Sequence, residues 1–322
     1  MSDLPADRLH ESPPFTNTGL DVFGPYLITE GLKTRKNSPE KKMWAVIFTC
    51  LVSRATHIEP LTMMDTSSFV NALRRFFAIR GTCKRIRSDR GSNFVGALNQ
   101  AATISLPKIN EELTRQNCEW ELNPSKASHF GGVWERKIGC AKSILGHCLL
   151  KLGSRHPTRD EIHTFLQEAA SIMNNTPLSP VSSDPNEPFP LTPAMLLTAK
   201  TFPNPAPPEA FTEADHLSYG SKRWRRVQIL SDEFFKRWRE EYVSKLTEKS
   251  KWLRKKRCPK EGDIFLIKED LAKRNDWPIG RVIKIHPSKD GLIRSVTLRL
   301  SSNGRERILI RPITKLVLLL ES

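Results

Sequence analysis

The strongest constraint on the fold is the order in which strand-like and helix-like segments follow one another. Residues 43–51 (MWAVIFTCL) form a β-rich apolar run, with strand-like segments at 18–26 and 56–60 on either side. Gly24-Pro25 is expected to end or bend the first of these strands. Apolar residues at helical spacing then predict a helix over 65–80, with an aspartate as N-cap and a glycine after its end.

The next segments extend this pattern. Residues 84–88 and 118–122 read as two short strands. The sequence HFGG at 129–132 opens a long helix, and a second helix follows over 158–174. Three strands, a helix, a strand and further helices are typical of an α/β domain around a mixed sheet.

The C-terminal part has a different pattern. Residues 177–210 are rich in proline and predict a linker, and 223–253 has the apolar spacing of one long amphipathic helix. Short strands with polar turns over 262–320 predict a small all-β barrel of SH3-like size. We therefore expect four parts: an N-terminal arm (1–14), an α/β core (15–200), a linker with a basic helix (201–257) and a β-barrel (258–322).

Charge favours a polyanionic partner. The chain of 322 residues has a net charge of +16, and residues 201–322 hold 27 Lys+Arg against 16 Asp+Glu. Nucleic acid is the commonest polyanion, although a basic protein need not bind it. The six cysteines form no C-x-x-C pair, so we expect reduced thiols and no structural zinc. We also expect no signal peptide and no membrane span.

Three acidic residues stand where metal-binding chemistry could use them. Asp21 lies within an apolar strand, Asp89 just past another strand, and Glu135 in the first turns of a helix. Oxygen ligands of this kind suit Mg²⁺ or Mn²⁺. Each acid also has an ordinary explanation: an edge-strand surface residue, an Asx-turn former and a helix N-terminal acid. Spacing alone leaves both interpretations open.

Sequence motifs around these acids resemble a known family. Residues 18–25 (TGLDVFGP), 88–94 (SDRGSNF) and 129–136 (HFGGVWER) resemble the three acidic motifs of retroviral-type integrases, in the form found in BEL/Pao retrotransposons. The resemblance continues at 223–227 (RWRRV) and 278–296, and so covers nearly the whole chain.

The resemblance implies a fold and an activity. The fold is α/β, an RNase H-like core with a mixed five-stranded sheet, then a long basic helix and an SH3-like barrel. Asp21, Asp89 and Glu135 would form a DDE triad that binds Mg²⁺ or Mn²⁺. The activity would be 3′-end processing of element DNA and strand transfer into target DNA by a homo-oligomer in the nucleus.

Two departures from the family pattern keep other functions open. Arg90 stands where the family usually has Asn, and the His/His/Cys/Cys zinc module typical of integrases is missing. One alternative is therefore a catalytically inactive or domesticated DNA-binding relative. Another is a ribonuclease H-like nuclease, because fold alone permits it, although the barrel and the FGGVWE motif argue against that.

Further residues are candidates for DNA contact. Lys142 lies seven residues after Glu135, on nearly the same helix face, and is either a phosphate contact or an ordinary solvated lysine. Asn93 either touches substrate or forms a turn. The basic run after Trp252 is interpreted as a phosphate-binding segment, against a solvated helix face or a nuclear-import signal; it comprises Arg254, Lys255, Lys256 and Arg257.

Overall fold

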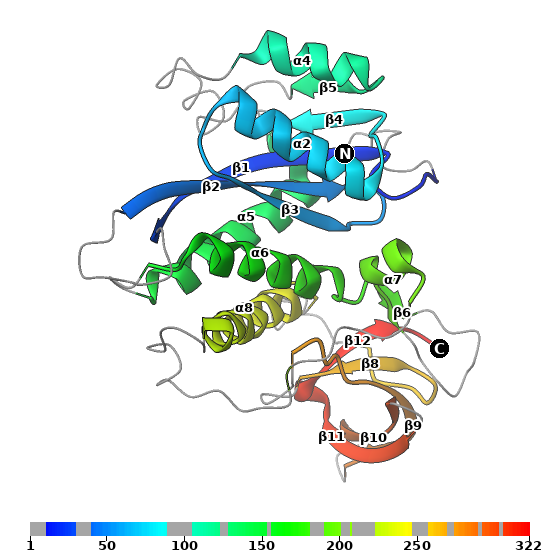
Figure 1. The fold of residues 1–322 in the computed structure, drawn as a ribbon. Helices are drawn as coiled ribbons and strands as arrows, with labels where there is room; N and C mark the ends of the chain where they lie inside the picture. The colour runs from blue at the N-terminus through cyan, green and yellow to red at the C-terminus, as the bar shows by residue number, and fades with distance from the viewer. Residues whose placement is uncertain are drawn as a thin grey trace. The chain divides into compact units, whose positions relative to one another are not determined.

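The computed structural model describes most of the chain in two folded units (Figure 1). The described residues are 11–29, 40–88, 105–122, 128–152, 156–180, 190–200, 207, 223–246, 257–268, 274–288, 292–302 and 305–322. Side chains are not described at 106, 122, 128–135, 179–180, 245, 301–302 and 305.

The first unit is built on a mixed five-stranded sheet. Strands β1 (Asn17–Thr29), β2 (Glu40–Cys50) and β3 (Thr56–Leu61) form an antiparallel meander. Strands β4 (Arg85–Ser88) and β5 (Glu119–Leu122) run parallel to β1, which gives the order β3-β2-β1-β4-β5. The predicted α/β class with a mixed five-stranded sheet is confirmed.

Helices cover the two faces of this sheet (Figure 1). Helix α2 (Thr66–Arg80) packs on one face, where Phe76 stacks on Phe48 of β2 with ring centroids 4.0 Å apart. Phe48 pairs with Leu20 of β1, so Leu20 points to that face. Its neighbour Asp21 points to the opposite face, because side chains alternate along a strand.

The opposite face carries α5 (Ser128–Leu150) and α6 (Arg159–Asn174). Lys142 of α5 bonds to Asp21, and Asn174 at the end of α6 exchanges two hydrogen bonds with the Thr56 backbone, each 2.7 Å long. These polar contacts fix both helices against the strands.

The sequence-based element boundaries needed several corrections. Strand β1 continues beyond the cis Gly24–Pro25 bond to Thr29, with a register shift between Phe23 and Tyr26. Strand β2 begins at Glu40, three residues before the apolar run that predicted it. A helix not predicted, α4 (Leu106–Arg115), lies between β4 and β5 in the chain.

The helix over 65–80 was predicted correctly in detail. The Asp65 carboxylate caps it by accepting a 2.6 Å hydrogen bond from the Ser68 N–H. Gly81 follows with φ 83°, and its N–H donates to the Phe77 carbonyl at 2.8 Å. The glycine provides a left-handed φ that a residue with a Cβ adopts only at a cost.

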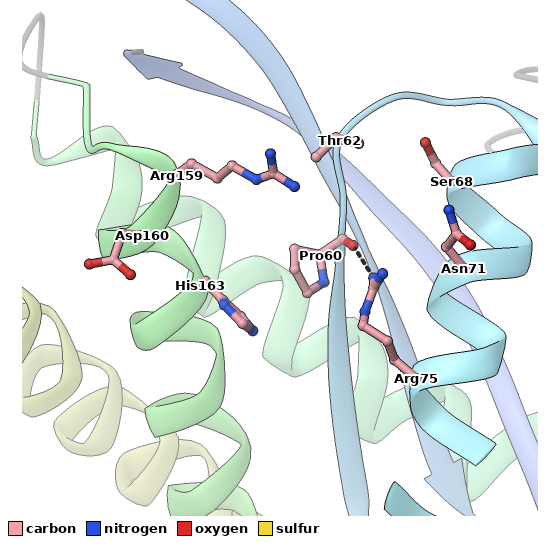
Figure 2. Close-up of a pocket in the computed structure, with 8 residues that line it drawn as sticks. All are labelled: Pro60, Thr62, Ser68, Asn71, Arg75, Arg159, Asp160 and His163. Carbon is pink, nitrogen blue, oxygen red and sulfur yellow. Dashed lines mark hydrogen bonds between the residues drawn. The ribbon is translucent and has the colours of Figure 1, made fainter. Parts of the chain in front are cut away.

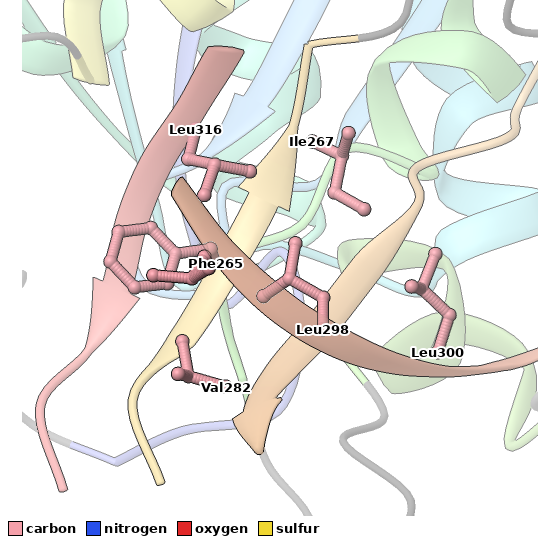
Figure 3. Close-up of a cluster of buried hydrophobic side chains, with 7 residues drawn as sticks. Phe265, Ile267, Val282, Leu298, Leu300 and Leu316 are labelled. Atoms are coloured by element: carbon pink, nitrogen blue, oxygen red, sulfur yellow. The ribbon is translucent and has the colours of Figure 1, made fainter. Parts of the chain in front are cut away.

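The second unit contains an all-antiparallel sheet of five strands in the order β11-β10-β9-β8-β12. These strands and the short helix η3 are β8 (Ile264–Ile267), β9 (Ile279–Pro287), β10 (Ile293–Ser302), β11 (Arg305–Pro312), η3 (Ile313–Lys315) and β12 (Leu316–Leu320). One buried cluster fills its inner face (Figure 3) and consists of Phe265, Ile267, Val282, Val296, Leu298, Leu300 and Leu316. The predicted small all-β part is confirmed.

The proline-rich region contains regular structure that was not predicted. It includes β6 (Ser179–Pro180), which pairs with β7 (Pro190–Leu191), and α7 (Pro193–Thr198). The amphipathic helix α8 runs over Arg223–Leu246. Its predicted continuation to residue 253 lies outside the described residues.

The chain divides into two compact units by packing. One comprises 1–174 and 207–238, and the other 175–206 and 239–322. Helix α8 therefore belongs partly to each unit, a division that differs from the four sequence-based parts, whose boundaries stay a prediction. In the residues searched, no helix has both the length and the apolar character needed to cross a bilayer.

Candidate active site

The candidate site is centred on Asp21 in the middle of β1. Its carboxylate is 29% exposed, although the neighbours Leu20 and Val22 are fully buried. An acid in this position loses hydration and needs positive charge nearby. Strand β1 thus brings a partly desolvated carboxylate to the face of the sheet that α5 covers.

Lys142 of α5 supplies that positive charge. Its Nζ atom donates a hydrogen bond to Asp21 Oδ2, and its side chain is 22% exposed. This contact was not predicted, because the sequence suggested only a DNA contact or a solvated lysine for Lys142. Its predicted contact with DNA phosphate stays a prediction.

The position of Glu135 follows from the same helix. Glu135 lies on α5 seven residues before Lys142, which is about two helical turns, on nearly the same face and about 10 Å along the axis. Its side chain is not among those described. The helix backbone therefore places Glu135 and Lys142 along one stripe of α5.

Strand β4 ends beside β1. Ser88, its last residue, pairs with Leu20 on one side and with Leu122 of β5 on the other. The Trp120 indole N–H also donates to Ser88 Oγ at 2.9 Å. Because these contacts hold the end of β4 level with the residue before Asp21, the next residue in the chain, Asp89, follows a strand end adjacent to Asp21.

Asp89 itself lies outside the described residues, together with Asn93, Arg254, Lys255 and Lys256. No group of three or more His, Cys, Asp or Glu that could hold a metal occurs among the residues searched. The triad of Asp21, Asp89 and Glu135 therefore stays a prediction, for which the structure gives the setting of Asp21 and of the α5 backbone.

Arg257 is the described member of the predicted basic run. Its guanidinium donates to both carboxylate oxygens of Asp263, at 2.9 and 3.1 Å. Burial would raise the pKa of Asp263, but the hydrogen bonds from Arg257 and from two backbone N–H groups lower it. One of these backbone donors is Ser322 N, so Asp263 joins Arg257 to Ser322 within the second unit. The proposed contact of Arg257 with DNA stays a prediction.

Lys137 is a further polar residue that the sequence reasoning missed. It lies on α5 between Glu135 and Lys142, and its Nζ donates to the Arg54 carbonyl at 2.5 Å. Burial of the ammonium group lowers the pKa of Lys137 to about 7, and the positive charge of Arg54 acts in the same direction. Part of the side chain remains exposed, so the buried part is the amine end.

This contact joins α5 to the turn after β2. Arg54 occupies that turn with a φ of 59°, an uncommon value for a residue with a side chain. A lysine on a helix usually extends into solvent, and nothing in the sequence around Lys137 indicated that its amine turns inward. Lys137 and Lys142 together hold α5 to the strands at two points, both C-terminal to Glu135.

Residues 222–319 match a family model described as Family of unknown function (DUF5641). This match covers less than half of the chain. It begins just before α8 and extends through most of the antiparallel sheet. No curated protein sequence matches the chain.

Solved structures of retroviral integrases are among those that this chain resembles. A chain in the simian T-cell lymphotropic virus intasome in complex with PP2A regulatory subunit B56 gamma aligns over 99% of this chain and 84% of its own, at 11% identity and TM-score 0.39. The HTLV-2 integrase catalytic core domain in complex with magnesium aligns in two forms. The trimeric form aligns over 53% of this chain and 91% of its own, at 16% identity and TM-score 0.34. The dimeric form aligns over 57% of this chain and 97% of its own, at 14% identity and TM-score 0.35.

Proposed function

We propose that this protein is a retrotransposon-type integrase of the BEL/Pao class, a polynucleotidyl transferase that processes DNA 3′ ends and joins them to target DNA. One observation carries the proposal. Lys142 of α5 contacts Asp21 of β1, the end of β4 at Ser88 is level with Leu20, and Glu135 precedes Lys142 by about two turns on the same helix.

The donor set at this position fits a hard divalent cation. Asp21 offers carboxylate oxygens that are partly removed from water, and such oxygens are preferred ligands of Mg²⁺. Asp21, Asp89 and Glu135 would hold Mg²⁺ or Mn²⁺. When bound, the metal supplies Lewis-acid activation of an attacking oxygen and stabilisation of the leaving oxygen.

Lys142 has two successive partners in this proposal. In the protein alone its ammonium group balances the Asp21 carboxylate. If Asp21 held a cation, Lys142 would be free to pair with a DNA phosphate beside the acids instead. A lysine on a flexible four-carbon stem can make this change without moving α5.

DNA binding rests on the charge distribution. Residues 201–322 contain 27 Lys+Arg against 16 Asp+Glu, and an excess of this kind attracts the phosphate backbone independently of base sequence. We propose DNA contacts by Asn93 and the basic run 254–257. We also propose that the protein acts as a homo-oligomer in the nucleus; light scattering and localisation of a tagged protein test these two points.

A strand-transfer assay with labelled DNA ends and Mg²⁺ or Mn²⁺ tests the proposal. Joining by Asp21→Asn, Asp89→Asn and Glu135→Gln should fall below one-hundredth of the wild-type level, roughly the range for losing one charge-stabilising group in a catalytic site. Glu119→Gln is the matched control, because Glu119 is a 70% exposed carboxylate on β5. Joining that survives in Asp21→Asn would refute the catalytic assignment.

The same assay separates the alternative function. A catalytically inactive DNA-binding relative would retain salt-dependent binding of duplex DNA and show no metal-dependent joining in the wild type. Filter binding at two salt concentrations, performed on the same preparations, distinguishes that outcome from a protein that has simply failed to fold.

A further inference from the structure

A second polar site lies at the other edge of the first sheet. A pocket of about 510 Å³ opens between α6 on one side and the end of β3 with α2 on the other (Figure 2). The residues that line it are Pro60, Thr62, Ser68, Asn71, Arg75, Arg159, Asp160 and His163. In the strand order, β3 is separated from β1, which carries Asp21, by β2. The pocket is therefore distinct from the candidate active site.

Basic side chains enter this pocket from both walls. Figure 2 shows the side chains of Arg159 and His163 extending from α6 towards Pro60, and Arg75 approaching Pro60 from α2. In the same view the Asp160 carboxylate points away from the space between them. The inward-facing charge of the pocket is therefore positive.

Arg75 already makes hydrogen bonds that fix its side chain in one wall of the pocket. Its Nε donates to Glu59 Oε2 at 2.6 Å, and its Nη2 donates to the Pro60 carbonyl at 3.0 Å. Burial would raise the pKa of Glu59, but its hydrogen bonds with His57 and Arg75 lower it. Glu59 therefore stays ionised and offsets the charge of Arg75, which leaves Arg159 as the arginine of the pocket whose charge is not offset.

Arg159 carries charge that no described group neutralises. Among the described residues it has no hydrogen-bond or ion-pair partner, and it is exposed. It is also the first residue of α6, and the acidic residues Asp160 and Glu161 follow it in the first turn. An anion beside Arg159 would be stabilised by that charge, and Arg75 on the opposite wall would contribute less because Glu59 offsets it.

We propose that this pocket binds a phosphate group. A guanidinium group donates two parallel hydrogen bonds to an oxyanion, and Arg159 and Arg75 face the pocket from opposite walls. The hydroxyl of Ser68 and the amide of Asn71 are neutral donors on the α2 wall. A tetrahedral phosphate has oxygens that can face both walls at once. The proposal does not rest on the integrase function.

Titration of the full-length protein with inorganic phosphate and with pyrophosphate, at low ionic strength, tests the site. Arg159→Gln should weaken pyrophosphate binding roughly tenfold, as expected for the loss of a charge-assisted hydrogen bond, and His163→Gln should weaken it less. Arg115→Gln is the matched control, since Arg115 is a 72% exposed arginine on α4. Equal affinities for Arg159→Gln and Arg115→Gln would overturn the proposal.

A second arm identifies the source of the phosphate. If the occupant is a DNA phosphodiester, Arg159→Gln weakens duplex binding more than Arg115→Gln does, and pyrophosphate competes with the duplex. If it is a free phosphate, duplex binding is equal in the two variants while the pyrophosphate difference remains. Thermal unfolding of each variant in buffer without phosphate shows that the fold is retained. DNA joining is scored separately, so failure of this site is distinguishable from failure of the integrase assignment.

Discussion

Lys142 and Asp21 form an ion pair between α5 and β1, with both side chains between one fifth and one third exposed. At this exposure an ion pair contributes little to stability, about 1 kcal/mol or less. Lys142→Met should therefore change the free energy of unfolding by no more than about 1 kcal/mol. DNA joining should fall on the order of 100-fold.

Urea unfolding and the strand-transfer assay measure the two effects, and Lys142→Arg is the control that keeps the charge. If the loss of joining merely tracks a loss of folded protein, Lys142 has only a structural role.

Competition between Lys142 and a cation gives a second prediction. Because the ammonium group and Mg²⁺ would share the Asp21 carboxylate, Lys142→Met should bind Mg²⁺ several-fold more tightly than the wild type in the absence of DNA. Isothermal titration calorimetry with MgCl₂ measures the affinity. Weaker binding in the variant would show that the two cations do not compete, and Asp21→Asn should abolish the difference between the lysine and methionine forms.

Lys137 predicts a pH dependence of stability. Its pKa in the folded protein, about 7, lies below the value of about 10.4 for a free lysine. Between these values the unfolded chain binds more protons than the folded chain. The free energy of unfolding therefore rises with pH from about 7 to about 10, by at most about 1.4 kcal/mol per unit. Below pH 7 the whole cost of burying the charged amine remains.

Lys137→Met removes this contribution. The free energy of unfolding of the variant should exceed that of the wild type most at pH 6 and least at pH 9, as measured by urea unfolding at both pH values. Lys108→Met, on the exposed face of α4, is the comparison. A pH-independent difference would mean that the amine is not buried in solution.

Arg257 is predicted to act on folding. Its two hydrogen bonds to Asp263 stabilise the second unit, so Arg257→Gln should lower the melting temperature. Since the pKa of Asp263 is lowered in the folded protein, this stabilisation is present at neutral pH and is lost as pH falls below about 4. Differential scanning calorimetry should show a large difference in melting temperature between wild type and Arg257→Gln at pH 7, and a small difference at pH 3. An unchanged melting temperature at pH 7 would favour a role in DNA contact alone.

Periodicity and capping gave the regular elements but not the polar contacts between them. The helix over 65–80 was predictable because its N-cap, apolar stripe and terminal glycine are all local signals. The inward turn of Lys137 and the pairing of Lys142 with Asp21 depend on how α5 packs on β1 and β2. Such contacts join residues more than 80 positions apart, so they leave no local signature.

The acids of the candidate site were predictable only through motif resemblance. A lone aspartate in a strand or after one has ordinary explanations, and spacing did not separate them. The register of β1 with β4 adds what the sequence could not: it places Leu20 beside Ser88, directly before Asp21 and Asp89 in the chain. Regular structure within the proline-rich region was missed because proline content indicated a linker, although β7 and α7 both begin with proline.

Ser88 is held by strand pairing on both sides, so the segment that follows it can change in length without moving the end of β4. Leu20 and Leu122 hold this strand end by backbone pairing, and the Trp120 indole holds its hydroxyl. At the other end of that segment, the Ser105 N–H donates to Thr66 Oγ1 of α2 at 2.6 Å. Insertions or deletions between residues 94 and 104, outside the proposed site residues Asp89 and Asn93, should therefore leave both boundaries in place, and chimeras that exchange this stretch between relatives should keep the same strand register.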